Sequence, residues 1–351
     1  INYMQSQDKG LAMDQMLIVR GPGTLDWETA KQKMKVFKEK AKQLPGVEAI
    51  TTSGAIPGGG ANWGADVRKS GAPQTDIKLG FVVYVDPDFI STYEIPFVAG
   101  NDFDPELHSS MESIIINESS LAAYDLGTAE EAIGQKLVLE SDTATVIGVL
   151  KNYNWESLRT EFQPYLFMPD EVVPNNLSIH LAANMIPESI DALREIYSEL
   201  VENEPFDYYF LDDSFNTQYK ADRLFGNIFA VFASLAVVIS CLGLWGLALF
   251  TTALKMKEIG VRKVLGASVN SIVYLLSGRF VKLVLVSSLI ALPLAWYGIS
   301  QWLNDFAFSI GMQWDFLLLP LVVLLLIALL TVSAQVLKGA VSNPVKVLRA
   351  E

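Results

Sequence analysis

The chain of 351 residues has few of the residues that form cross-links or common catalytic sites: one cysteine, Cys241, and two histidines. With a single cysteine no intrachain disulfide can form, although this alone does not decide the compartment. No Ser/His/Asp or Cys/His set with a supporting pattern is present. We therefore expect no catalysis by this chain.

The signature G-x-x-x-x-G-K-[ST] is also absent, so the chain has no P-loop with which to bind ATP itself. Glycine clusters at 21–23 and 58–60 are too short and too loosely placed to hold a phosphate, and we interpret them as turns. One acidic loop could coordinate a cation, but it lacks the glycine and distal glutamate of a calcium loop. Its candidate ligands are Asp102, Asp104, Glu106 and His108. We predict no metal site and no cofactor.

Positive charge is scarce in the first two thirds of the chain. Residues 1–222 hold 16 Lys and Arg against 35 Asp and Glu, a net −19, whereas residues 223–351 hold 10 against 4, a net +6. This asymmetry indicates two regions in different surroundings. The acidic region is long enough to bury its own core, and its charge argues against a nucleic-acid partner.

The acidic region has the pattern of an α+β domain with two β-α-β units. The first unit comprises strands at 15–20 and 47–52 around a helix at 27–44, and the second comprises strands at 177–183 and 206–211 around a helix that begins at Pro187. An insertion at about 56–172 separates them, with strand patterns at 77–85, 113–116, 136–139 and 144–150 and a helical patch at 119–124. We predict one subdomain that carries a β-rich insertion.

The helix predicted at 27–44 is amphipathic. Its apolar positions, spaced three and four apart, are Trp27, Ala30, Met34, Phe37, Ala41 and Leu44. Other positions carry Lys31, Lys33, Lys35, Lys38, Lys40 and Lys42. We interpret these lysines as a solvated face rather than an anion-binding site.

Three long uncharged runs distinguish the second region. They comprise 31 residues between Arg223 and Lys255, 22 between Lys282 and Asp305, and 22 between Asp315 and Lys338. Because a helix needs about 20 apolar residues to cross the hydrocarbon core, we predict spans at about 225–250, 272–298 and 316–337. Arg279 and Lys282 fall in the first turns of the second span, where long side chains can reach the inner interface.

The charges that flank these spans predict their orientation. Lys and Arg are concentrated in the loop 251–271 and the tail 338–351, which we therefore place in the cytoplasm. The loop 299–315 has neither and is predicted outside, as is the acidic domain one span earlier. Because a domain outside must be delivered there, we also expect a further transmembrane helix before Ile1.

The stretch at 255–268, KMKEIGVRKVLGAS, carries four cations against a single acid, Glu258. If 261–268 is helical, Val261, Val264, Leu265 and Ser268 form a mostly apolar stripe, and glycines at 260 and 266 offer a break at either end. Two interpretations stay open. One is a short amphipathic helix, held against the inner membrane surface and gripped by a soluble partner. The other is a basic loop that obeys the positive-inside rule.

Several segments together resemble a known family. The run CLGLWGLALF (241–250), then KEIGVRKVLGAS (257–268), two further spans and NPVKVLRAE (343–351) is similar to the C-terminal half of an FtsX-like permease. The acidic domain resembles a MacB-like periplasmic core domain, through segments 85–103, 114–127, 133–137, 146–159 and 205–219. The resemblance covers essentially the whole chain, and its most specific part is 257–268.

The resemblance implies a permease of a bacterial ABC transporter of the mechanotransmitting kind, in the inner membrane, with its large domain (1–222) in the periplasm and its membrane domain at 223–351. Expected partners are an ABC ATPase subunit, membrane lipids, a second permease half or a homodimer partner, and a periplasmic protein or peptide. In such units the loop between the second and third spans contacts the ATPase. Carried over residue by residue, this coupling element comprises Lys257, Glu258, Ile259, Gly260, Val261, Arg262, Lys263, Val264, Leu265, Gly266 and Ala267.

Related permeases handle peptides, lipoproteins, lipids and drugs, so we expect ATP-driven export or extraction of such a molecule. Related permeases often carry two units, which makes this chain, by resemblance, the C-terminal half of a longer permease. Two other classes stay open: a membrane-anchored ligand-sensing subunit without transport, and an exported enzyme with a membrane anchor. The tail after Lys338 is short for an output domain, and no catalytic set is visible, which disfavours both.

Overall fold

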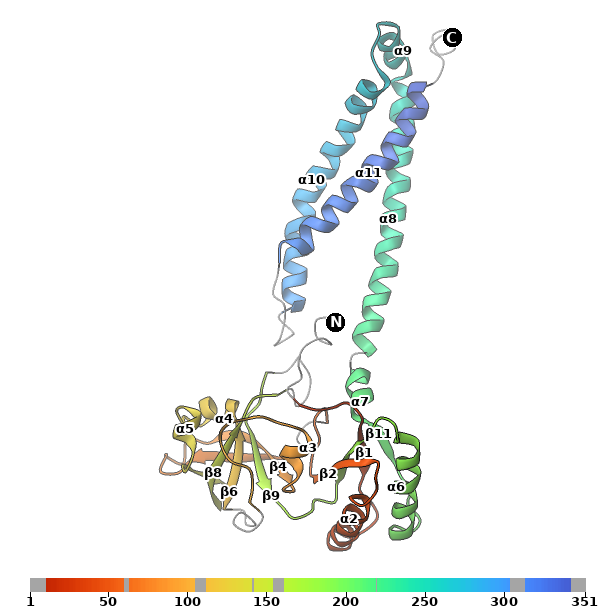
Figure 1. Ribbon diagram of the computed structural model, residues 1–351. Coiled ribbons are helices and arrows are strands. Elements are labelled where there is room, and N and C mark those ends of the chain that lie inside the picture. The colour runs from red at the N-terminus through yellow and green to blue at the C-terminus, as the bar shows by residue number, and fades with distance from the viewer. Residues whose placement is uncertain are drawn as a thin grey trace. The chain divides into compact units, whose positions relative to one another are not determined.

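The computed structural model describes residues 11–59, 63–104, 112–140, 142–153, 161–218, 220–303 and 313–341. The chain divides into two compact units, Ile1–Ala221 and Asp222–Glu351 (Figure 1). Each unit is considered by itself below.

The first unit is built on an antiparallel sheet with two helices. Its elements are β1 (Met16–Arg20), α2 (Trp27–Ala41), β2 (Val47–Ser53), β10 (Asn176–Leu181), α6 (Ile186–Leu200) and β11 (Tyr208–Phe210). The strands pair in the order β11-β1-β10-β2, and every pair is antiparallel. This is the split β-α-β arrangement, in which two β-α-β units interleave. The two predicted β-α-β units are therefore confirmed.

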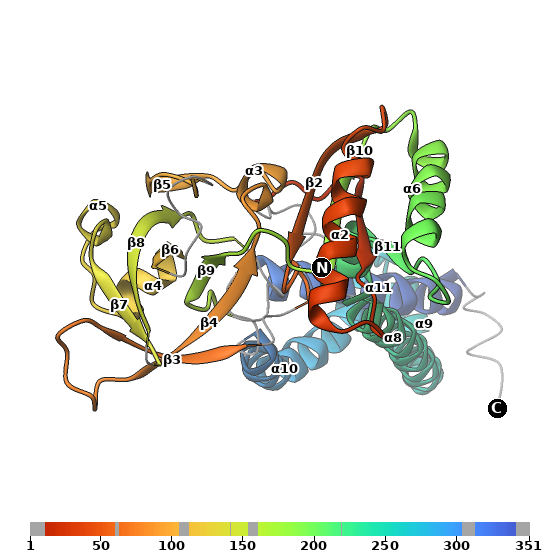
Figure 2. The ribbon, with the colours of Figure 1, turned by 90° about the horizontal axis from the view of Figure 1, so that it is seen from below.

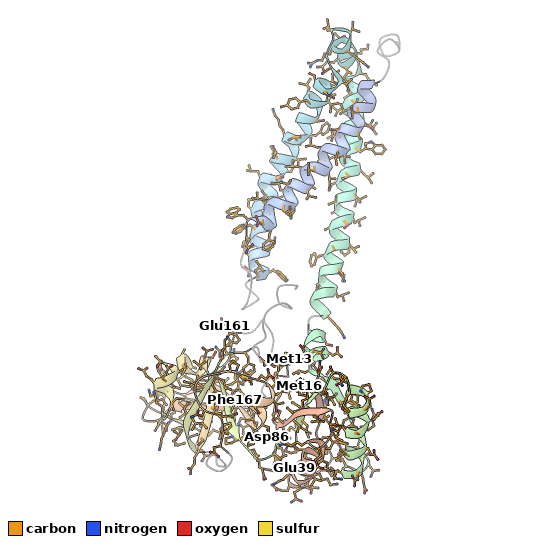
Figure 3. All side chains as sticks on the ribbon, viewed as in Figure 1. Met13, Met16, Glu39, Asp86, Glu161 and Phe167 are labelled. Carbon is orange, nitrogen blue, oxygen red and sulfur yellow. The ribbon has the colours of Figure 1, made fainter. Side chains whose placement is uncertain are left out.

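Strand β1 is buried on both faces, because successive side chains point to opposite sides of a sheet. Leu17 and Val19 belong to the core cluster that contains α2 and α6 residues. Met16 and Ile18 belong to a second cluster, which also contains Phe167 (Figure 3). Burial on both faces explains why this strand is a continuous apolar run in the sequence rather than an alternating one.

Helix α2 begins at a capped residue and buries the predicted stripe. The Asp26 carboxylate accepts a hydrogen bond from the Thr29 backbone N–H at 3.1 Å, which satisfies one of the unpaired donors of the first turn. Four stripe residues are buried: Ala30, Met34, Phe37 and Ala41. Trp27, which was expected in the stripe, is 50% exposed.

The lysines of this run remain at least partly exposed, as a solvated face requires, with the exception of Lys38. Several of them nevertheless form ion pairs with carboxylates from other elements. Lys38 is buried, and its Nζ lies 2.6 Å from Asp86 Oδ2 and 2.6 Å from Asp88 Oδ2. Further pairs are Lys31–Asp170, Lys35–Glu171, Lys40–Glu199 and Lys42–Asp88. The lysine run fastens α2 to the loops and helix around it.

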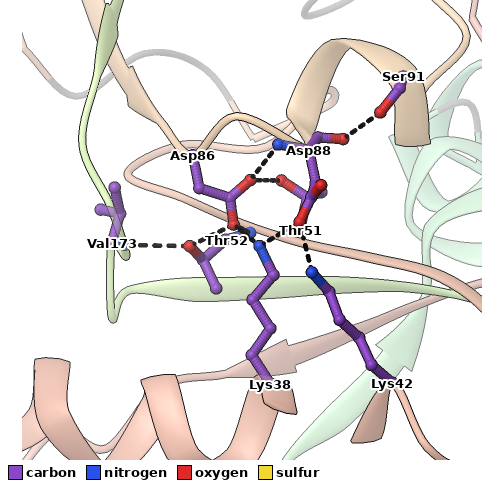
Figure 4. A network of polar contacts seen from close by, with 8 residues as sticks. All are labelled: Lys38, Lys42, Thr51, Thr52, Asp86, Asp88, Ser91 and Val173. Carbon is purple, nitrogen blue, oxygen red and sulfur yellow. Dashed lines mark hydrogen bonds and ion pairs between the residues drawn. The ribbon is translucent and has the colours of Figure 1, made fainter. Parts of the chain in front are cut away.

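The carboxylate of Asp86 lies at the centre of a buried polar network (Figure 4). It accepts hydrogen bonds from Lys38 Nζ and from the side-chain hydroxyls of Thr51 and Thr52. It also accepts hydrogen bonds from the backbone N–H groups of Thr52 and Asp88, and all five distances lie between 2.5 and 3.1 Å. Desolvation favours a higher pKa for the neighbouring Asp88, but hydrogen bonds from two lysines outweigh it and hold that pKa below its ordinary value. The network joins β2 to the end of β4 (Lys78–Val85).

The insertion adds further strands to the same sheet. Its elements are β3 (Gly64–Lys69), β4 (Lys78–Val85), α3 (Phe89–Thr92), β5 (Phe97–Gly100), β6 (Ser113–Asn117), α4 (Glu118–Ala123), α5 (Ala129–Ala132), β7 (Lys136–Leu139), β8 (Asp142–Leu150) and β9 (Tyr165–Pro169). Among the described strands, β4, β3, β7, β8, β6 and β9 pair in that order, and β9 pairs again with β4. In Figure 2 these strands lie on one side of the unit, and α2 and α6 lie on the other.

Three of these strands, β3, β5 and β9, were not predicted. Each is short, from four to six residues. Short apolar runs such as YLFMP do not show enough of a period to separate a strand from a helix or loop. The predicted strands at 77–85, 113–116, 136–139 and 144–150 correspond to β4, β6, β7 and β8.

The chain leaves the first unit through α7 (Leu211–Gln218) and continues as α8 (Lys220–Leu254), α9 (Met256–Val264), α10 (Val269–Leu303) and α11 (Asp315–Val341). Three of the described helices are long and apolar enough to cross a membrane, over Leu224–Leu254, Val269–Leu303 and Asp315–Leu337. The predicted fold class, an α+β domain followed by three apolar helices, is confirmed.

Helices α10 and α11 pack against each other along much of their length. At one end the rings of Trp296 and Trp314 have centroids 5.1 Å apart. At the other end Leu276 of α10 shares a core cluster with Val332 and Val336 of α11. Helix α8 joins them through a hydrogen bond of 3.0 Å from Trp245 Nε1 to Gln335 Oε1. Interhelical hydrogen bonds of this kind contribute to helix association within lipid.

Candidate functional site

The basic stretch forms a short helix that follows α8 almost without a break. Helix α8 ends at Leu254, and the Lys255 backbone N–H donates to the Thr251 and Thr252 carbonyls. The first bond of the new helix runs from Ile259 N–H to the Lys255 carbonyl at 2.9 Å. The structure places the helix at Met256–Val264, so only the first four residues of 261–268 belong to it.

The single acid of this stretch holds two of its cations. Glu258 Oε2 lies 2.8 Å from Lys255 Nζ, and its Oε1 lies 3.0 Å from Arg262 Nη2. The spacings are three and four residues, which bring side chains together on one side of a helix. Because these groups are partly exposed, the pairs contribute little to stability. Their effect is to fix the direction of the Arg262 side chain.

Helix α9 ends in a Schellman motif at Gly266. The Ala267 N–H donates to the Arg262 carbonyl at 2.9 Å, and the Gly266 N–H donates to the Lys263 carbonyl at 3.1 Å. Gly266 has φ +89°, which L side chains rarely adopt. Ser268 then begins α10, and its hydroxyl accepts a hydrogen bond from Ser271 N–H at 3.3 Å. The glycine predicted as a break reverses the chain between two helices.

One side of α9 is anchored in the helical bundle. Ile259 is 5% exposed and belongs to a cluster with Ala248 of α8, Ile272 of α10 and Val332 of α11. Gly260 beside it is also buried. Because the cluster draws a side chain from each of the three long helices, a force on α9 would reach all three.

The opposite side of α9 exposes an apolar ridge. Val261, Val264 and Leu265 are 50%, 69% and 80% exposed. They lie at i, i+3 and i+4, which forms one helical stripe. Arg262 and Lys257 are exposed beside it. The predicted stripe therefore exists, but it faces away from the bundle, while the buried contact is made by Ile259 and Gly260.

The other candidate residues form no site within the described part of the chain. Glu106 and His108 lie outside the described residues, and no group of metal-binding side chains is found among those described. The Asp102 Oδ1 accepts a hydrogen bond from Phe103 N–H, and burial raises its pKa. His180 Nδ1 lies 3.3 Å from Glu48 Oε2, across the β10–β2 pair. These contacts hold local structure.

The geometry defines a class: a protein with a mixed α/β domain and three membrane-capable helices, which carries a short basic helix between two of them. The chain belongs to the family of the MacB-like periplasmic core domain, whose family model matches residues 1–199. The model of the FtsX-like permease C-terminal domain matches residues 230–344. The chain is thus a permease component of an ABC transporter, and permeases of this family work with an ABC ATPase partner.

Solved structures give weaker likenesses. The periplasmic region of MacB from Actinobacillus actinomycetemcomitans is 11% identical, with a TM-score of 0.42, and the alignment covers 62% of this chain and 98% of that chain. The extracellular domain of the noncanonic ABC-type transporter YknZ from Gram-positive bacteria is 12% identical, with a TM-score of 0.41 and coverage of 56% and 99%. No curated protein matches the sequence.

Proposed function

We propose that this chain couples ATP hydrolysis in a partner ATPase to a change of shape in its periplasmic domain. It would be a multi-pass protein of the bacterial inner membrane, with the first unit in the periplasm. The work would be export or extraction of a peptide, lipid, lipoprotein or drug. Membrane lipids and a second permease half or second copy would complete the assembly.

The observation that carries the proposal is that one side of α9 is buried in the helical bundle while the other side is exposed. A partner that grips the exposed ridge of Val261, Val264 and Leu265 would bury apolar area, which is the main source of affinity at an interface. Arg262 and Lys257 would add charge complementarity, which sets specificity and association rate. Ile259 would pass the displacement to the long helices. The coupling element is therefore proposed at 257–267, from Lys257 to Ala267.

The family supports a partner ATPase as the source of energy, because permeases of this family work with one. The lack of a P-loop in these 351 residues agrees with that assignment. A membrane-anchored sensor would also have an extracytoplasmic domain, but it would not need an exposed apolar ridge on α9. Docking of a kinase or cyclase at α9, in place of an ATPase, would favour that alternative.

The test is the double charge reversal Arg262→Glu/Lys263→Glu. Like charges placed across an interface cost several kcal/mol, so we expect affinity for the ATPase to fall at least about tenfold and coupled ATP hydrolysis to fall with it. The measurements are co-purification from membranes and ATPase activity of the reconstituted complex. Lys33→Glu/Lys40→Glu, which makes the same change of charge in the first unit, serves as control. An intact complex with unchanged coupled activity would refute the coupling role.

A further inference from the structure

A groove of about 970 Å³ runs between α10 and α11 within the second unit. Apolar residues such as Val273, Val281 and Leu329 line its walls. Polar side chains also reach it, although the helices that form it are apolar over most of their length: Asn270, Tyr274, Ser277, Lys282 and Ser333. Asn270, Tyr274 and Ser277 are spaced four and three residues apart on α10, so they share one side of that helix. Lys282, five residues further on, lines the same groove and completes this polar track.

The packing of the two helices fixes how deep this track reaches. Trp296 lies beside Trp314, and Leu276 packs with Val332 and Val336, so the helices run antiparallel in a constant register. Lys282 and Leu329 line the same groove. At 1.5 Å per residue, Leu329 lies about 14 Å along the helix from Lys338. Lys282 is therefore near the middle of the uncharged run 316–337, rather than at the inner interface.

A lysine at this depth has no carboxylate partner in the three described apolar helices. The segments 224–254, 269–303 and 315–337 contain one acidic residue, Asp315, at the end of α11 opposite Lys338. A second copy of the chain would bring no carboxylate to this level either. Charged side chains within a membrane face a cavity or a counter-charge, so an anion bound in the groove is one way to balance this lysine.

Ser277 gives an independent sign of a ligand. It is 5% exposed and lines the groove, and its hydroxyl has no hydrogen-bond partner. Serines elsewhere in α10 behave differently: the hydroxyls of Ser287 and Ser288 donate to backbone carbonyls four residues earlier. An unpaired buried hydroxyl costs free energy unless a ligand accepts its hydrogen bond.

We propose that this groove binds an anionic phospholipid from the cytoplasmic leaflet. The phosphate would move along the polar track from Asn270 to Lys282, pair with the ammonium group and accept a hydrogen bond from Ser277. The acyl chains would lie against the apolar walls and the surrounding bilayer. A lipid fits better than an acidic helix of another protein, because the track begins at the inner surface, where headgroups reside. The assignment rests on the membrane orientation in the proposed function.

The test is native mass spectrometry of the full chain released from vesicles of equal parts phosphatidylglycerol and phosphatidylcholine. We expect retained phosphatidylglycerol on the wild type and about tenfold less on Lys282→Gln, since a hydrogen bond to a charged group is among the strong ones. Gly278→Leu fills the groove, where an added Cβ meets no atom within 4 Å, and should also release the lipid. The controls are Lys338→Gln and Gly298→Leu, which should retain the lipid. An added Cβ at Gly298 also meets no atom within 4 Å, but Gly298 does not line the groove.

Equal retention of phosphatidylglycerol by Lys282→Gln and wild type would overturn the proposal, as would equal retention of phosphatidylcholine. A protein carrying an acidic helix that co-purifies through Lys282, with no lipid retained, would overturn it in favour of that partner. The measurement needs no ATPase, so it stands apart from the coupling test. If the lipid is retained but the coupling test fails, only the proposed function is refuted. If the coupling test succeeds but no phosphatidylglycerol is retained, only the lipid site is refuted.

Discussion

At the scale of single residues, the junction of the first sheet with its insertion depends on one buried ion pair. The Lys38 side chain is 7% exposed and that of Asp86 is fully buried. Burying two charges is costly, and the cost is offset only when the remaining hydrogen-bonding capacity is used. The threonines Thr51 and Thr52 use that capacity on Asp86. The pair thus specifies where β2 and β4 meet, although it adds little net stability.

Removal of one partner should expose this cost. Lys38→Met leaves Asp86 buried and unpaired, and loss of one member of a buried pair typically costs about 3–5 kcal/mol. We expect a clear drop in the thermal unfolding temperature of the full chain, with faster hydrogen exchange in β2 and β4. Asp86→Asn in the same variant should recover part of the loss, because it removes the stranded charge.

The matched control for this variant is Lys40→Met on the same helix. Lys40 pairs with Glu199, but both side chains are exposed, 40% and 66%, and such pairs are worth about 0–1 kcal/mol. Equal destabilisation by Lys38→Met and Lys40→Met would mean that burial of the Lys38 pair does not increase the stability lost when the pair is broken.

At the scale of elements, the nine-residue helix α9 is held in place by its buried side and still exposes its other side to solvent. A helix this short is marginal in isolation, so its order depends on the anchor at Ile259 and on the glycine that closes it. The same glycine turns the chain into α10, which leaves the ridge of Val264 and Leu265 at the outermost point of the turn. Exposed apolar groups in such a position are typical of a surface that a partner covers.

Substitution of that glycine should loosen the helix end. Gly266→Ala places a Cβ at φ +89°, where it meets no atom within 4 Å, so the penalty is one of backbone conformation, about 1–2 kcal/mol. We expect faster hydrogen exchange at 262–267 and weaker coupling to the ATPase. At Gly243, inside α8, an added Cβ also meets no atom within 4 Å. Gly243→Ala should therefore slow hydrogen exchange slightly around residue 243, because alanine favours a helix. Slower exchange in both variants would contradict the role given to Gly266.

At the scale of the whole molecule, the chain separates charge between its units. The acidic first unit uses its lysines in ion pairs with its own carboxylates, so its net charge of −19 for residues 1–222 remains on its surface. Seven of the ten cations of the second region flank the apolar helices, at 255–263 and after 337. This distribution is the basis for placing the first unit and α9 on opposite sides of a membrane.

Labelling of single cysteines tests this placement. In a Cys241→Ser background, Ser70→Cys lies in an exposed turn of the first unit and Leu265→Cys lies on the α9 ridge. A membrane-impermeant maleimide applied to intact spheroplasts should label Ser70→Cys and should label Leu265→Cys only after lysis. Labelling of both positions without lysis would place them on the same side and would overturn the orientation.

The first unit illustrates how far pattern alone reaches. The stripe of Ala30, Met34 and Phe37 was predictable, because a helical period repeats within a few turns. The burial of Lys38 on the same helix was not, since its partner Asp86 lies 48 residues away and no local signal joins them. The strands β6 (SIIIN) and β7 (KLVL) are as short as β3 (GADVRK) and β5 (FVAG), but they are richer in aliphatic residues and were predicted.

The sequence by itself determined the properties that depend on near neighbours along the chain: the division of charge, the three apolar helices, and a basic stretch interrupted by glycine at 266. Only the tertiary structure decided which surfaces those elements present. It turned Val261, Val264 and Leu265 outward and Ile259 inward, and it set Lys282 level with the middle of α11. The physical reason is that exposure and depth depend on packing between helices distant in sequence, which a local pattern does not encode.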